Sequence, residues 1–356
     1  MAISMATRRN FLAGMAIAVL PHRAWADAGS PACLAAGKLG ENFVLHGLAQ
    51  NGESRFSIAL PARGHAACAH PVRPLAVVFA RRPGIYALVI DCASGLLRHH
   101  LTPPAGRQFN GHGAFNTDGS LLMTSEVVAE GSEGRIGLWE TSGFTRVAEW
   151  ASGGIGPHDL KRLPDGRIVV ANGGIVTDPA DRSKLNLAAM RPNLSLLSPD
   201  GALLEQIELD PALRQNSIRH LALTPKGVAF AMQWEGDLAE AVPPLGLWTP
   251  GHPPVLCDAA PEDAFALQGY AGSIAASADG GQIAITSSKG GAVMLFSGDG
   301  APLATHRRPD ISGIAAAPDG FCATDGQGVV WACDQAGLAP LAQHQVLWDN
   351  HLVAIG

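Results

Sequence analysis

One short unit recurs along this chain, and five of its copies carry a histidine at the same position. The copies read RGHAACAHPVRP, NGHGAFNTDG, IGPHDLKRLPDG, SIRHLALTPKG, AGSIAASADG, ISGIAAAPDG and the terminal WDNHLVAIG. Each opens a short apolar strand, and all but the last then reach a turn. The opening positions are His65, His112, His158, His220, Ser273, Gly313 and His351. A unit that recurs in this way constrains the fold more tightly than any local propensity does.

The step from opening position to turn is nearly constant. It is six residues from His112 to Asp118 and seven from His158 to Asp165, a difference that a β-bulge can absorb. Asp-Gly pairs between apolar runs are hairpin signals, and RIVVANGG, RIGLWE and FTRVAEW read as the further strands of a unit. Four antiparallel strands recurring every 38 to 62 residues are typical of propeller blades.

Seven units predict an all-β fold, a seven-bladed β-propeller. The last unit has only one strand after His351, and its outer strands must come from elsewhere in the chain. The segments ENFVLHGLA and SRFSIALPA, near residues 40–60, precede the first unit and can supply them. We therefore expect the terminal strands to share the last blade and close the ring, which leaves no free sheet edge.

The N-terminus predicts an export signal. Arg8-Arg9-Asn10-Phe11-Leu12 is a twin-arginine motif, an apolar run too short for a bilayer follows, and Ala24-Trp25-Ala26 is a small-x-small cleavage site. We expect a signal peptide at residues 1–26, a propeller domain at residues 27–356 and a periplasmic location. The competing interpretation is an accidental Arg-Arg pair before a buried helix. The mature chain shows no membrane span, and we expect a monomer.

Charge and cysteine content narrow the function classes. A net charge of −6 without a basic stripe argues against nucleic acid as a partner. The six cysteines form no Cys-x-x-Cys pair, which argues against a structural zinc site or a c-type haem. Cys322 and Cys333 can bridge across a hairpin in an oxidising compartment, and buried free cysteines are the equal alternative.

The five repeat histidines predict a metal site. In a propeller the inner strands line the central channel, so His65, His112, His158, His220 and His351 converge from five consecutive blades at its mouth. In the other two blades this position is Ser273 or Gly313, so that side of the channel mouth carries no bulky side chain. Neutral imidazole suits iron, copper or zinc, and such binding requires deprotonated rings, so metal should be lost as the pH falls through about 6.5.

Three other interpretations of the histidines stay open. They can be structural, as in WD40 blades, where a histidine bonds to a turn of its own blade. They can fill and hydrate the channel without a metal. They can also bind an anion or organic ligand when protonated. His70, His99 and His100 lie away from the expected channel mouth and read as ordinary packing or surface residues.

A second tier of candidates ends the second strands on the same face. These residues are Arg81, Arg82, Glu126, Asn172 and Glu235. The carboxylates can complete a coordination sphere or act as a base, and solvated loop charges are the simpler interpretation of each. An insertion at residues 177–193, with a short helical stretch, should rise on this face as a lid, a docking loop or a passive insertion.

The order of motifs also carries a family resemblance. The set RGH, FARRPG, GHGAFNTDG, GIGPHDLKRLPDGRIVVANGG, KLNLAAMRPNL, NSIRHLAL, MQWEGD, GYAGSIAASADG and WDNHL resembles the bacterial DUF1513 family over essentially the whole mature chain. The resemblance implies a twin-arginine-exported propeller of the YVTN or quinoprotein-like type. It also implies a gene neighbourhood of imelysin-like proteins and a di-haem oxidoreductase, which associates with iron acquisition. It supplies no catalytic residues.

Three functions follow as hypotheses. The leading one is a periplasmic protein that binds a transition metal and takes part in iron or copper handling. The second is a metal-dependent oxidoreductase, lyase or hydrolase that uses the histidine ring. No nucleophile–base pair is recognisable, which disfavours the nucleophilic hydrolases. The third is a scaffold that docks periplasmic haem or imelysin-like partners.

Overall fold

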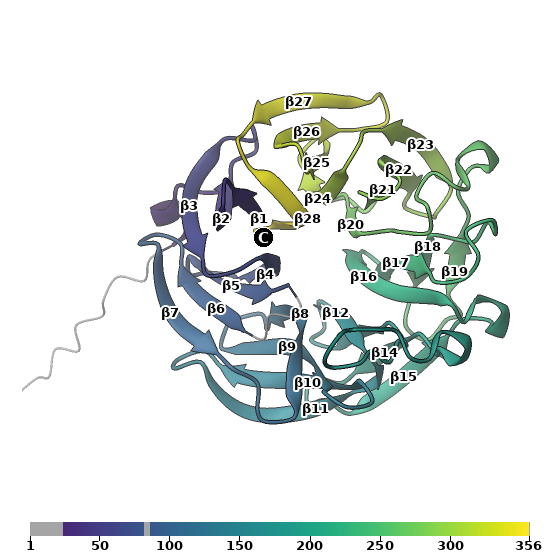
Figure 1. The fold of residues 1–356 in the computed structure, drawn as a ribbon, viewed down its shortest axis with the longest axis horizontal. Coiled ribbons are helices and arrows are strands. Elements are labelled where there is room, and N and C mark those ends of the chain that lie inside the picture. Colours follow the sequence, from purple (N-terminus) through teal and green to yellow (C-terminus); the bar gives the residue numbers. More distant parts are fainter. Residues whose placement is uncertain (1–23, 82–85, 356) are drawn as a thin grey trace, which may run out of the picture.

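The computed structural model describes residues 24–81 and 86–355, and these residues form seven four-stranded antiparallel sheets around a central channel (Figure 1). The prediction of an all-β, seven-bladed propeller is confirmed. The only helical elements among the described residues are four short 3₁₀ turns: η1 (Trp25–Ala28), η2 (Leu187–Ala189), η3 (Pro211–Leu213) and η4 (Pro261–Asp263).

Blades 1 to 3 follow one another along the chain, each with its first strand at the channel. Blade 1 is β4 (Gly64–Ala69), β5 (Leu75–Ala80), β6 (Ala87–Asp91) and β7 (Leu96–Leu101). Blade 2 is β8 (Arg107–Phe115), β9 (Leu121–Val128), β10 (Glu133–Glu140) and β11 (Thr145–Ile155). Blade 3 is β12 (Pro157–Arg162), β13 (Ile168–Asn172), β14 (Asn193–Leu197) and β15 (Leu203–Glu208).

Blades 4 to 6 continue the ring in the same order. Blade 4 is β16 (Asn216–Thr224), β17 (Gly227–Trp234), β18 (Leu245–Trp248) and β19 (Val255–Cys257). Blade 5 is β20 (Ser273–Ala276), β21 (Gln282–Ser287), β22 (Ala292–Ser297) and β23 (Pro302–Arg307). Blade 6 is β24 (Ile311–Ala317), β25 (Gly320–Asp325), β26 (Val329–Cys333) and β27 (Leu338–Gln343).

Blade 7 joins the two ends of the chain, as expected. Its inner strand is β28 (Leu347–Ala354), and its outer strands are β1 (Cys33–Leu39), β2 (Asn42–Leu48) and β3 (Ser54–Leu60). The N-terminal segment therefore supplies three strands, where the sequence pattern indicated two. The sequence of β1, CLAAGKL, is rich in Ala and Gly, which are weak strand formers, and pairing with β28 and β2 makes it a strand.

The hydrophobic core lies between neighbouring blades. Phe230 of blade 4 is fully buried and packs in one cluster with Leu194 of blade 3, and equivalent clusters join the other blades. Because each blade covers the face of the next, the inner strands contact one another in sequence around the channel. The ring is thus a rigid frame for side chains that point toward its axis.

All six cysteines are buried free thiols. Cys333 pairs across the hairpin with Phe321, and Cys322 pairs with Ala332. Successive residues of a strand point to opposite faces, so the two thiols enter different core clusters. The hairpin bridge is therefore not formed, and the alternative of buried free cysteines is the one observed.

Among the described residues, none belongs to a helix with the length and apolarity needed to cross a bilayer. The twin-arginine motif lies outside the described residues, whereas the expected cleavage site, Ala24-Trp25-Ala26, lies within them. There, the indole N–H of Trp25 donates a hydrogen bond to the backbone carbonyl of His70 at 2.9 Å.

Candidate metal centre

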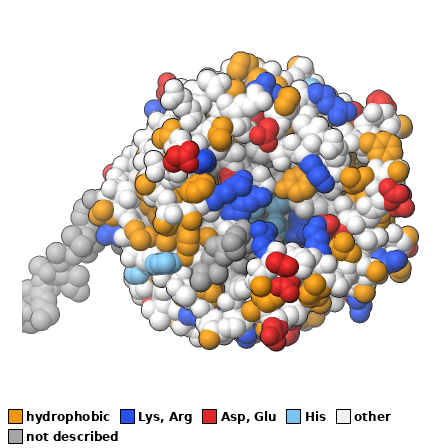
Figure 2. Space-filling model, viewed as in Figure 1, with side chains coloured by type: hydrophobic (Ala, Val, Ile, Leu, Met, Phe, Trp, Pro, Cys, Tyr) orange, Lys and Arg blue, Asp and Glu red, His pale blue; other side chains and the backbone are white. Residues whose placement is uncertain are grey.

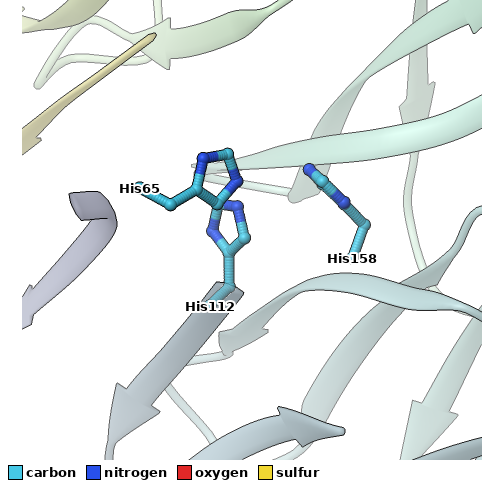
Figure 3. Close-up of side chains that lie close together, drawn as sticks. All are labelled: His65, His112 and His158. Carbon is cyan, nitrogen blue, oxygen red and sulfur yellow. The ribbon is translucent and has the colours of Figure 1, made fainter. Parts of the chain in front are cut away.

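The five repeat histidines meet at the channel mouth. Ring centroids are 4.6 Å apart for His65 and His351, 4.6 Å for His158 and His220, and 4.8 Å for His220 and His351. His112 lies near the middle of the group, 4.8 Å from His158, 5.0 Å from His351 and 5.2 Å from His65. Figure 3 shows the rings of His65, His112 and His158 turned toward one another.

Irregular strand pairing aims these side chains at the axis. The register shifts at the histidine in each of the five blades, between Phe109 and Gly113 in β8 and between Ile218 and His220 in β16, for example. A β-bulge redirects side chains that regular pairing would leave in the blade interface. The histidines therefore lie at bulges. The sequence analysis expected each histidine to open its strand, but β8, β16 and β28 begin several residues before the histidine.

A glycine beside one of the histidines permits the close approach. Gly111 precedes His112 and has φ +101°, in the left-handed region that favours glycine. A Cβ atom at this position would lie 2.5 Å from Cδ2 of the His65 ring. The Gly-His pair in this unit thus makes room for the imidazole of the neighbouring blade.

Burial keeps four of the five imidazoles neutral, those of His112, His158, His220 and His351. It is the main cause that holds the pKa of His112, His158 and His220 well below the usual value, and neighbouring histidines lower it further. The pKa of His351 is lowered to about 4, again chiefly by burial, with Arg81 and Lys161 lowering and Asp349 raising it. Neutral rings offer a lone pair to a metal, whereas an anion-binding role for protonated histidines is disfavoured.

Several ring nitrogens are buried without a hydrogen-bond partner. These are Nε2 of His112, both nitrogens of His158 and Nε2 of His351. An unsatisfied buried polar atom costs about 1–3 kcal/mol, so a cluster of them indicates an absent partner such as a metal ion or water. The ring contacts run between blades rather than to each histidine's own turn, which argues against the WD40-type structural role.

Two sets of three histidines have the geometry of potential metal ligands. The sets are His65, His112, His158 and His112, His220, His351, and within each set the donor atoms lie within 4.8 Å of one another. Nitrogens bound tetrahedrally at about 2.0–2.1 Å are roughly 3.4 Å apart, so modest rotation of the rings would complete a three-histidine site. His112 belongs to both sets.

Asp159 is a residue of this centre that the sequence reasoning missed. It is buried, and its Oδ1 lies 3.6 Å from Nδ1 of His112. The same oxygen accepts hydrogen bonds from the backbone N–H of Leu160 at 2.8 Å and from Lys161 at 3.3 Å. Asp159 therefore places a carboxylate beside the far nitrogen of His112, where such a group leaves Nε2 for a metal. The available signal was its place directly after His158, in a predicted inner strand.

A cavity of about 200 Å³ opens above the histidines. Arg81 and Glu235 line it, as predicted for the second tier, and Arg82 lies outside the described residues. Tyr270, directly before blade 5, lines the arc that Ser273 and Gly313 leave without bulky side chains. Its hydroxyl accepts a hydrogen bond from Asn350 Nδ2 at 2.9 Å.

The insertion between β13 and β14 helps to form this cavity. Thr177, Arg182 and Lys184 line the cavity, and Lys184 forms an ion pair with Glu235 of blade 4. The expected helical stretch is η2. The segment at residues 177–193 therefore forms part of the channel mouth.

The other two second-tier residues lie elsewhere. Glu126 is buried and accepts hydrogen bonds from Thr124 and Arg146, so it belongs to a polar network within blade 2. Asn172 is buried and joins blades 2 and 3 through Ser152, which donates to its Oδ1 at 2.7 Å. Asn172 ends β13 as predicted, whereas Glu126 lies inside β9, two residues before its end. Both side chains turn into the blades because the alternation of side chains along a strand sets their direction.

Three histidines that the sequence analysis set aside, His70, His99 and His100, are structural or exposed. His70 accepts hydrogen bonds at Nδ1 from the backbone N–H groups of Val72 and Arg73, at 3.1 and 3.0 Å, and so stabilises its own turn. His99 and His100 lie on the outer strand β7 and pack against Phe144 and Tyr86. None of the three reaches the channel mouth.

The fold and the site together define a class, a seven-bladed propeller with a histidine cluster at the mouth of its channel. Residues 58–355 match the family described as "Protein of unknown function (DUF1513)". The chain belongs to this family, as the order of its motifs indicated.

Comparison with solved structures supports the fold. A chain of hydrazine synthase from Kuenenia stuttgartiensis is similar with a TM-score of 0.60 and 13% identity, over 80% of this chain and 87% of that one. A chain of a mitotic checkpoint complex is similar with a TM-score of 0.56 and 11% identity, over 78% and 75% of the two chains. No match is found among curated proteins. Such distant likeness is evidence of architecture and not of activity.

Proposed function

We propose that this protein is a periplasmic metal-binding propeller that takes part in the handling of iron or copper. The histidines at the channel mouth hold the metal, and zinc is the remaining candidate for the ion. The observation that carries the proposal is the convergence of five imidazoles, three of which, those of His112, His158 and His351, have buried ring nitrogens without a hydrogen-bond partner. Channel filling alone would leave these atoms unsatisfied at a cost in stability, whereas a metal ion would use their lone pairs.

The shape of the centre suits a bound and exchangeable ion. Three histidines occupy one side of a coordination sphere, and the cavity lies on the other. A structural metal site is usually closed by four protein ligands, whereas three ligands leave a position open. The open position supports a second candidate function, a metal-dependent enzyme in which water or substrate binds the ion from the cavity.

Location and partners belong to the proposal as well. The twin-arginine motif supports export of a folded, metal-loaded protein to the periplasm, where we expect it to act as a monomer. Iron-uptake or haem proteins, including imelysin-like proteins, are the proposed partners. Replacement of Arg8-Arg9 by Lys-Lys should retain the protein in the cytoplasm, and the exported form should begin near Asp27 by N-terminal sequencing.

Metal analysis of the exported protein tests the central claim. Protein purified from the periplasm without chelators should contain close to one equivalent of a transition metal by mass spectrometry of the elements. His112→Ala, which removes the histidine common to both sets, should lose the metal, and the exposed His100→Ala should keep it. Less than about a tenth of an equivalent in the unaltered protein, with circular dichroism showing it folded, would favour the scaffold function.

A further inference from the structure

The cavity above the histidines is lined by an unusual number of cations. Arg81, Arg182, Lys184 and Arg219 all face it, and Glu235 is the one carboxylate among its described lining residues. These side chains come from blades 1 and 4 and from the insertion at residues 177–193. Figure 2 shows blue Lys and Arg side chains gathered around the central hollow, with pale-blue histidine at its floor.

Ion pairs neutralise only part of this charge. Asp349 pairs with Arg81 at 3.0 Å and with Arg63 at 2.5 Å. Glu235 pairs with Lys184 and lies 3.8 Å from Arg219. Four cations of the described residues, Arg63, Arg81, Lys184 and Arg219, therefore share two carboxylates, those of Asp349 and Glu235. The local excess is positive, although the whole chain carries a net charge of −6.

Assembling these cations is unfavourable without an anion. Burial and the nearby Arg81 lower the pKa of Arg182, and burial lowers that of Arg219. Nε of Arg219 is buried and has no hydrogen-bond partner, and its side chain is only 12% exposed. Buried guanidinium groups normally pair with carboxylate or phosphate oxygens, which their planar array of N–H donors fits.

We propose that the channel mouth binds a small, multiply charged oxyanion of the carboxylate or phosphate class, directly above the histidines. Arg219 and Arg81 face it from opposite sides as charged donors, with Lys184 at the rim. Gln233 and the Tyr270 hydroxyl line the same space and can add neutral hydrogen bonds. A volume of about 200 Å³ admits a di- or tricarboxylate or phosphate and excludes a polymer.

The anion would be bound by Arg and Lys side chains and not by protonated histidines. The anion site therefore does not depend on the metal proposal. If the metal proposal also holds, the two sites are stacked along one entry path. A bare metal cation would meet a repulsive potential at the rim, whereas a metal carried as an anionic carboxylate complex would be attracted. That consequence rests on the proposed function; the anion site does not.

Calorimetric titration of metal-free full-length protein tests the site. The protein is stripped on a chelating resin, because soluble polycarboxylate chelators are themselves candidate ligands. The two probes are inorganic phosphate and propane-1,2,3-tricarboxylate, a tricarboxylate that binds metals weakly, with acetate as a monovalent reference. We expect binding of one or both multivalent anions, weaker binding at higher salt, and little binding of acetate. Binding of phosphate alone would assign the site to phosphate ligands, and binding of the tricarboxylate alone would assign it to carboxylate ligands.

Matched substitutions separate the site from general surface charge. Arg219→Gln should weaken binding by about 10- to 100-fold, the range expected for a lost charged hydrogen bond. Lys184→Gln, on a more exposed side chain, serves if Arg219→Gln fails to fold. Lys226→Gln removes a cation at the β16–β17 turn, at the other end of blade 4, and should bind as the unaltered protein does. Equal affinities in all variants, or no binding of either anion, would overturn the proposal whatever the metal content.

Discussion

The backbone N–H of Leu221 donates a hydrogen bond of 3.0 Å to Oδ2 of Asp159. Asp159 follows His158 in β12, and Leu221 follows His220 in β16. This hydrogen bond therefore links the two inner strands that carry these histidines. The other oxygen of Asp159, Oδ1, faces His112 of blade 2. One buried carboxylate thus connects the inner strands of three consecutive blades around the proposed metal.

Replacing this carboxylate tests its role beside His112. Asp159→Asn keeps the size of the side chain and removes the negative charge that lies 3.6 Å from Nδ1 of His112. Metal affinity should fall by about 10- to 100-fold in competition titrations with a coloured chelator. Asp91→Asn is the matched control, because Asp91 is also a buried carboxylate that accepts backbone N–H groups, in a blade-1 turn. Unchanged affinity in Asp159→Asn would remove Asp159 from the centre.

The shared histidine should matter most among the ligands. His112→Ala disrupts both sets of three, whereas His158→Ala and His220→Ala each leave one set intact. We therefore expect the greatest loss of metal from His112→Ala, partial loss from the other two, and little from His70→Ala. The metal content of each purified variant measures the order. Equal loss from His70→Ala and His158→Ala would place the metal outside the channel mouth.

The stability of the metal-free protein should depend on pH because of its buried histidines. The pKa of His46, His70 and His351 is lowered to about 4, and that of His112, His158 and His220 lies well below the usual value. In the unfolded chain these rings take up protons near pH 6.5. Between about pH 6.5 and 4 the unfolded state therefore binds more protons than the folded state.

It follows that this contribution to stability is complete above about pH 6.5 and is lost progressively as the pH falls below it. The midpoint of thermal unfolding should be lower at pH 5 than at pH 7.5. A midpoint that stays constant or rises between these pH values would contradict neutral, buried rings.

Metal release should occur at a lower pH than the histidine composition alone predicts. The sequence indicated loss near pH 6.5, where free histidine titrates. Because the ring of His351 has a pKa of about 4, protons compete for it only in more acidic solution. Equilibrium dialysis over pH 7 to 4 should therefore show retention at pH 6 and release closer to pH 4. Half-release at pH 6.5 would indicate ligands with ordinary pKa values.

The thiols should be unreactive in the folded protein and irrelevant to the metal. Burial raises the pKa of Cys33 and Cys68 to about 12 and that of Cys322 to about 11, so little thiolate exists at neutral pH. A thiol reagent should label fewer than about one cysteine in native protein and all six after denaturation, with the metal retained in the native sample. Rapid native labelling accompanied by metal loss would implicate a thiolate ligand.

The repeat itself was sufficient to predict the architecture and the convergence of five histidines. Seven similar units, six of which reach a turn after a nearly constant step, bury their strands by stacking as blades. This periodicity can be read from the local sequence. A histidine at the same place in five inner strands must then approach one axis. His65, His112, His158, His220 and His351 were all identified on this basis, and the structure brings them together.

Side-chain direction and long-range pairing could be decided only by the tertiary structure. Glu126 and Asn172 lie in or at the end of their second strands, yet the side chain of each turns into a blade, because pleating and neighbouring donors set its direction. Asp159 and the cations Arg182 and Arg219 acquire their roles from residues far away in the chain. The physical reason is that strand periodicity is a local property, whereas burial, charge pairing and the aim of a side chain at a bulge arise only when blades pack against one another.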